Sequence, residues 1–114
     1  AKTQGLAALR LPEHARWRRA LNEGQGFTSC GWIFDADTQF DTVGFMEWVR
    51  LAPVERAKGV VRIPEGTLLI NRQGQELNIE TRPLAPLDSR IELIHSENTD
   101  WNALQSALFK IRLS

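Results

Sequence analysis

The side chains best suited to hold a metal ion or to act as a nucleophile are one cysteine and two histidines, Cys30, His14 and His95. They lie far apart in the sequence, so only folding could bring them together. Cys30 stands in an apolar stretch, where a free cysteine is usually a small buried hydrophobic residue. No neighbouring base or cation is evident that would stabilise its thiolate. A metal-binding module that uses Cys30 with His95 or His14 is therefore an alternative hypothesis.

Motifs of common catalytic centres are missing from the sequence. It has no glycine-rich phosphate loop, no His-Glu-x-x-His, no Cys-x-x-Cys, no Gly-x-Ser-x-Gly and no tyrosine. Asp35 and Asp37 could chelate a hard cation, but no third oxygen ligand is evident, and paired carboxylates in a turn usually just end a strand. From the residues alone, the chain is interpreted as a non-catalytic module.

Two groups of basic residues could form an interaction surface. The groups are Arg16, Arg18 and Arg19 near the N-terminus, and Arg56, Lys58 and Arg62 in the middle of the chain. Solvated arginines are one interpretation of the first group, and a docking surface for an acidic partner or a missing domain is the other. The second group falls on the outer face of a predicted strand, where it could bind an anion or be neutralised by cross-strand ion pairs with Glu76, Glu80 and Glu92.

Bulk composition argues against nucleic-acid and membrane partners. The 14 basic and 14 acidic residues cancel, so no global field attracts a polyanion. Trp32 and Phe34, with Lys58 and Arg62, could still form a nucleic-acid-binding sheet, a third and weaker alternative. No apolar run approaches the ~20 residues that span a bilayer. One cysteine excludes an internal disulfide and favours a reducing, cytoplasmic location.

Hydrophobic periodicity predicts the elements that must position these residues. Residues 55–63 alternate as a strand, and Gly59 in its centre predicts a close approach to the backbone there. Asp41 is expected to cap a helix that Pro53 ends, with Phe40 packing on Phe45 as a hydrophobic staple. The predicted order is a helix over 12–21, a strand over 27–34, that capped helix, strands over 55–63, 67–72, 76–82 and 90–95, and a helix after 98–100.

This order predicts one α+β domain. We expect a small mixed, mostly antiparallel sheet of four to five strands, with a βαβ start and two principal helices on one face. The strand–helix–strand start requires a right-handed crossover and a parallel pair, whereas the short turns that follow require antiparallel pairs. Residues 1–26 are assigned to an N-terminal segment with a peripheral helix, and residues 27–114 to the domain itself.

Several segments in this order resemble the C-terminal domain of the CobW family of P-loop GTPases, over residues 28–113. The matching features are the strand over 28–34, a helix that ends in Trp48-Val49-Arg50-Leu51-Ala52-Pro53, an Arg-x-Lys-Gly strand at Arg56-Ala57-Lys58-Gly59, the strand Ser89-Arg90-Ile91-Glu92-Leu93-Ile94, and Asp-x-x-x-Leu at Asp100-Trp101-Asn102-Ala103-Leu104. The family's late strand usually continues into glycine, where this chain has His95.

The resemblance implies that the full-length parent is a GTPase of the group that contains metallochaperones and cobalamin-biosynthesis proteins. It implies GTP, magnesium and zinc or cobalt as cofactors of the parent, and none in this chain. The nucleotide loop and the Cys-x-Cys-Cys metal motif of the family belong to an N-terminal P-loop GTPase domain that is missing here. This chain would be a non-catalytic regulatory or docking domain, with that GTPase domain and a metal-requiring client protein as partners.

Overall fold

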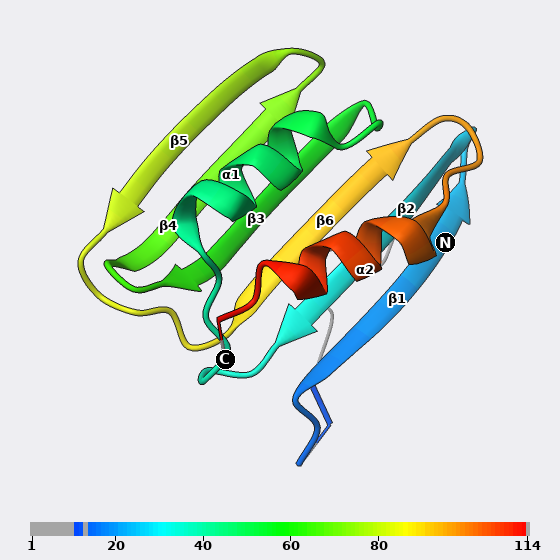
Figure 1. The fold of residues 1–114 in the computed structure, drawn as a ribbon. Helices are drawn as coiled ribbons and strands as arrows, with labels where there is room; N and C mark the ends of the chain where they lie inside the picture. Colours follow the sequence, from blue (N-terminus) through cyan, green and yellow to red (C-terminus); the bar gives the residue numbers. More distant parts are fainter. Residues whose placement is uncertain (1–10, 13, 114) are drawn as a thin grey trace.

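Two α-helices cover one face of a six-stranded sheet in the computed structural model, which describes residues 11–12 and 14–113 (Figure 1). The α+β class and the placement of both helices on one face are confirmed, while the sheet has six strands rather than four to five. The strands are β1 (Trp17–Gly24), β2 (Phe27–Phe34), β3 (Arg56–Ile63), β4 (Gly66–Gln73), β5 (Glu76–Arg82) and β6 (Ser89–His95), and the helices are α1 (Thr42–Leu51) and α2 (Trp101–Lys110).

The N-terminal segment differs from its prediction. The helix expected over 12–21, of which residue 13 lies outside the described residues, is wrong: residues 17–24 form β1, which pairs antiparallel with β2 along its whole length. Gln25 and Gly26 join the two strands with φ values of 53° and 82°, the positive pair that a two-residue type I′ hairpin turn needs. Pairing with β2 thus overrides the helix propensity of the Ala, Arg and Leu residues. The division of the chain after residue 26 stays a prediction.

The last strand of the chain lies in the middle of the sheet. The strand order is β1-β2-β6-β3-β4-β5, and every neighbouring pair is antiparallel. Because β6 is antiparallel to both β2 and β3, those two strands run in the same direction, as Figure 1 shows. The two strands that α1 connects therefore run parallel, but β6 lies between them, so the parallel pair expected from the sequence does not form.

Both helices begin as the sequence predicts. The carboxylate of Asp41 accepts a hydrogen bond of 2.8 Å from the backbone N–H three residues on, and that of Asp100 accepts the equivalent bond of 3.0 Å at α2. The rings of Phe40 and Phe45 have centroids 5.5 Å apart, which confirms the staple contact. Neither helix of the described ranges is long and apolar enough to cross a bilayer.

The hydrophobic core lies between the helices and the sheet and is rich in aromatic rings. Its largest side chains are fully buried, and they include Trp32, Phe34, Phe40 and Phe45. The ring of Phe45 also presses on β3: a Cβ atom at Gly59 would lie 3.1 Å from its Cζ atom. The close approach predicted at Gly59 is therefore confirmed, and its cause is the packing of α1 on the central strands.

A buried arginine holds the C-terminus of α1 against β4. Arg72 is only 6% exposed, and its Nη1 atom donates to the backbone oxygens of Val49, Arg50 and Ala52 at 2.7, 2.9 and 3.0 Å. Its Nη2 atom donates to the oxygen of Val54. The carbonyls at a helix C-terminus have no partner within the helix, so the guanidinium satisfies them and complements the helix dipole.

Candidate functional site

The sheet face turned away from the helices carries the basic residues of the middle of the chain. Successive side chains of a strand point to opposite faces. Arg56, Lys58 and Arg62 of β3 therefore lie on this helix-free face, while Ala57 and Val61 between them are buried in the core. The predicted outward orientation of the three basic side chains is confirmed. Their role in binding stays a prediction.

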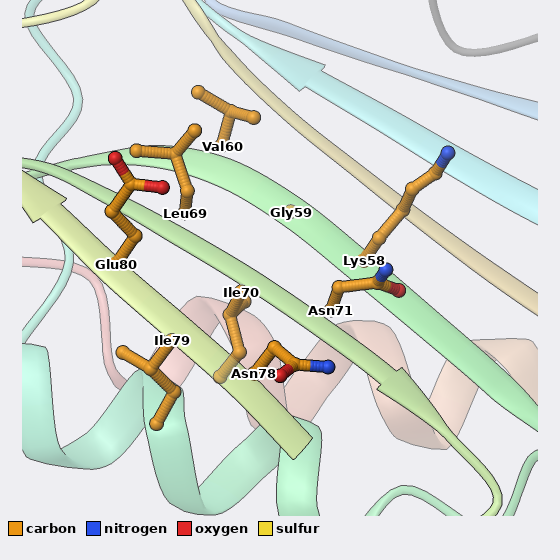
Figure 2. A pocket seen from close by; sticks show the side chains of 9 residues that line it. All are labelled: Lys58, Gly59, Val60, Leu69, Ile70, Asn71, Asn78, Ile79 and Glu80. Atoms are coloured by element: carbon orange, nitrogen blue, oxygen red, sulfur yellow. The ribbon is translucent and has the colours of Figure 1, made fainter. Parts of the chain in front are cut away.

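A groove of about 450 Å³ crosses β3, β4 and β5 on the helix-free face (Figure 2). Its side chains form two rows across these strands: Lys58, Asn71 and Asn78 in one, and Val60, Leu69 and Glu80 in the other. The first row is polar and begins with a cation. The second row has an aliphatic pair and ends with a carboxylate. The groove thus offers a charge, two amides and an apolar surface side by side.

The carboxylates near this groove neutralise its positive charge only in part. Glu80 forms an ion pair of 2.7 Å with Arg82 of its own strand. Glu92 on β6 lies opposite Lys58 in the ladder, and burial raises the pKa of Glu92, against a smaller opposing effect of Lys58 and Arg56. Within the described ranges no ion pair joins Lys58 to a carboxylate. The cross-strand neutralisation expected from sequence is therefore incomplete at Lys58.

The N-terminal arginines are not a single cluster in the structure. Arg16 forms an ion pair of 2.9 Å with Asp35. Burial raises the pKa of Asp35, but hydrogen bonds from Arg16 and Thr38 outweigh that effect and hold it below its ordinary value. Arg19 donates to two side chains of α2 at 2.8 and 3.2 Å, whereas Arg18 is exposed on the opposite face of β1. Arg16 and Arg19 thus bind other parts of this domain, and a docking role for the three residues stays a prediction.

The possible metal ligands do not form a complete site. His95 lies opposite Thr28 in the β2–β6 ladder, so it shares the helix side of the sheet with Cys30. Cys30 is fully buried, and burial raises its pKa to about 12, which keeps the thiol protonated at neutral pH. His95 has its Nδ1 atom 3.6 Å from a carboxylate oxygen of Glu55, and His14 lies in a turn before β1. Across residues 11–12 and 14–113, no three His, Cys, Asp or Glu residues are grouped to hold a metal ion.

The aromatic residues proposed to stack on nucleic-acid bases are inaccessible. Trp32 and Phe34 are 0% exposed and lie on the helix side of β2. Trp32 packs edge-on against Trp48 of α1, with ring centroids 5.9 Å apart. Lys58 and Arg62 lie on the opposite face of the sheet. The nucleic-acid hypothesis in this form is wrong, because its stacking residues and its cations do not share a surface.

Sequence reasoning missed the amides of the groove and the buried arginine. Alternation along residues 76–82 identifies Asn78 as outward-facing, yet its position beside Asn71 depends on the β4–β5 register. Arg72 also belongs to an alternating strand, where it follows Leu68 and Ile70 at the inward positions. A cation at an inward position of a strand is the signal that could have drawn attention to it.

Comparison with known proteins identifies the family of this chain. The chain belongs to the family described as the cobalamin synthesis protein cobW C-terminal domain, whose family model matches residues 29–112. It is 71% identical over 111 residues to the zinc chaperone YeiR of Escherichia coli (strain K12), an alignment that covers 97% of this chain and 34% of that relative. The chain thus spans about a third of the relative's length. No solved structure matches the chain.

Proposed function

We propose that this chain is a non-catalytic docking domain of a GTP-dependent zinc chaperone. Its membership of the cobW C-terminal family, together with a grooved basic sheet face that no described element covers, is the observation that carries the proposal. The domain would contact the GTPase part of a longer protein, or the metal-requiring client that receives the ion, and would regulate the transfer between them.

Chemistry in this scheme belongs to the rest of the protein. A P-loop GTPase domain would bind GTP with magnesium and would hold the metal cargo. Zinc is our choice of cargo over cobalt, because the relative that is 71% identical to this chain is named a zinc chaperone. The buried, protonated thiol of Cys30 supports this division of labour, since a metal ligand must be a thiolate. We propose a cytoplasmic location and a role in metal homeostasis.

A chimera tests this proposal, in which the chain replaces the matching third of the E. coli relative. We expect the chimera to hydrolyse GTP at a rate close to that of the unmodified relative, and the isolated chain to hydrolyse none. The identity of 71% makes misfolding of the junction a small concern, and circular dichroism of the chimera checks it. Appreciable GTP turnover by the isolated chain would contradict a non-catalytic role.

A further inference from the structure

We propose that the groove over β3, β4 and β5 is the docking site for an acidic, extended segment of a partner protein. A carboxylate of the segment would sit at Lys58, and an aliphatic side chain would cover Val60 and Leu69. The inference rests on the proposed docking function and deepens it, because it names the surface and the chemistry of the partner.

The shape of the groove favours a protein segment over a small molecule. Its volume of about 450 Å³ would suit a small ligand, but all of its lining residues belong to three strands of one sheet. Small-molecule sites bury roughly 70–90% of the ligand, which requires walls on several sides. A segment of a larger partner needs only one such surface, since the partner itself excludes water from the other side.

The dimensions of the polar row match an extended chain. Lys58, Asn71 and Asn78 lie on three successive strands in register. Strands are about 4.8 Å apart, so the row is roughly 10 Å long, which is the length of about three extended residues. Amide side chains both donate and accept hydrogen bonds, so Asn71 and Asn78 can pair with the peptide groups of a segment that crosses the strands.

The charged residues around the groove determine which sign of charge the partner segment must carry. On β3, β4 and β5 the basic residues of the helix-free face are Arg56, Lys58, Arg62 and Arg82, and the acidic ones are Glu76 and Glu80. Glu92 of β6 adds a third carboxylate beside Lys58, and its burial favours the uncharged form. The ion pair between Arg82 and Glu80 cancels one charge of each sign. The chain as a whole has a formal net charge of zero, so the remaining positive charge is a local property of this surface. An acidic segment complements it, and a basic one would be repelled.

The aliphatic pair supplies the contact that does not depend on charge. Val60 and Leu69 are direct partners in the β3–β4 ladder and are each partly exposed on the helix-free face. Covering such a pair removes apolar surface from water, which favours association. A segment that alternates acidic and aliphatic residues therefore satisfies both rows of the groove.

The test uses a defined peptide of alternating glutamate and valine, titrated into the isotope-labelled chain and followed by NMR. We expect saturable shifts at the amides of β3, β4 and β5 and at the side chains of Asn71 and Asn78. The substitution Lys58→Gln should weaken binding by up to about fivefold, because the charge pair is exposed. Leu69→Ala should weaken it by roughly fivefold to tenfold through lost apolar contact. Added salt should weaken binding of the wild-type chain.

Matched controls separate this site from non-specific attraction. Lys110→Gln removes an exposed cation at the end of α2 and should leave binding unchanged. A peptide of glutamine and valine should bind more weakly than the acidic peptide. Spectra of each variant without peptide show whether it remains folded.

Several outcomes would overturn the inference. Two of them concern the peptides: chemical-shift changes confined to residues outside β3–β5, or equal binding of the acidic and the glutamine peptide. Concentration-dependent chemical shifts in the groove without peptide would make a second copy of the chain the occupant. Preferential binding of a single-stranded oligonucleotide at the same residues would make a nucleic acid the occupant. Absence of peptide binding in a chain whose chimera still hydrolyses GTP would remove this inference alone. GTP turnover by the isolated chain would remove the proposed function whatever the peptide does.

Discussion

Replacement of Arg72 by methionine is predicted to destabilise the domain by about 3 kcal/mol. The guanidinium is buried and donates to four backbone oxygens between Val49 and Val54. Hydrogen bonds from a charged group contribute roughly 1.5–3 kcal/mol each, or about 6–12 kcal/mol for four. Taking the guanidinium out of water costs several kcal/mol, which offsets more than half of this sum. Methionine fills a similar volume but leaves the carbonyl oxygens without a donor.

Urea and thermal unfolding, followed by circular dichroism and tryptophan fluorescence, measure the effect. At about 4 °C per kcal/mol for a domain of this size, the Tm of Arg72→Met should fall by roughly 12 °C. Arg72→Lys should recover part of the loss, because an ammonium group is a point charge that cannot span four oxygens as a planar guanidinium does. Four tryptophans contribute to the fluorescence, and one of them, Trp48, links α1 to α2 through a hydrogen bond of 3.0 Å from its Nε1 atom to the oxygen of Leu104.

Arg50→Met is the matched control, because it makes the same change on the exposed side of α1. Among the residues that the structure describes, the Arg50 side chain pairs with Glu47 of its own helix alone, so the free energy of unfolding should stay close to that of the wild type. A value for Arg72→Met within about 1 kcal/mol of the wild type would refute the reasoning. Water would then satisfy the carbonyls as well as the arginine does, and the free-energy cost of burying the guanidinium would equal the gain from its hydrogen bonds.

Three further predictions concern the helix-free face, the cysteine and the central strand. Burial is the dominant influence on Glu92 and raises its pKa above the ordinary value of 4.5. Between pH 4.5 and the raised pKa, the native state keeps a proton that the unfolded state loses. The free energy of unfolding therefore falls as pH rises through this interval. Glu92→Gln should therefore be more stable than the wild type above this interval and equal to it below, and a difference that grows toward acid in urea titrations would contradict the assignment. A cobalt(II) titration at neutral pH should give no thiolate charge-transfer band, because Cys30 is buried and protonated; a saturating band that Cys30→Ala abolishes would restore the metal-binding hypothesis. Gly59→Ala should cost about 1–3 kcal/mol by overpacking against Phe45, and Phe45→Leu should relieve part of that cost in the double variant if the ring is the obstacle.

Local signals account for much of what sequence reasoning predicted correctly. The cap at Asp41, the staple of Phe40 on Phe45 and the alternation in β3 each depend on residues within about one turn or one strand. Such interactions form wherever the segment is placed, so their sequence patterns are informative. The family resemblance also held, because the order of these elements along the chain is itself a sequence property.

The segment before residue 26 shows where local signals fail. Its Ala, Arg and Leu residues favour a helix, yet residues 17–24 are held as β1 by β2. Gly26 was the available sequence clue to a hairpin, because a two-residue turn needs the positive φ values that the structure shows at Gln25 and Gly26. Intrinsic propensity differs by only tenths of a kcal/mol per residue, so pairing along eight residues outweighs it.

The sequence by itself determined the α+β class, the caps and the outward orientation of Arg56, Lys58 and Arg62. Only the tertiary structure decided that β6 enters between β2 and β3, which places Glu92 opposite Lys58. It also decided that Asn71 and Asn78 share one row of the groove, and that Cys30 is sealed beneath the helices. Periodicity reports which side of its own element a residue occupies. The neighbour that it meets there depends on register and strand order, which contacts between distant parts of the chain determine.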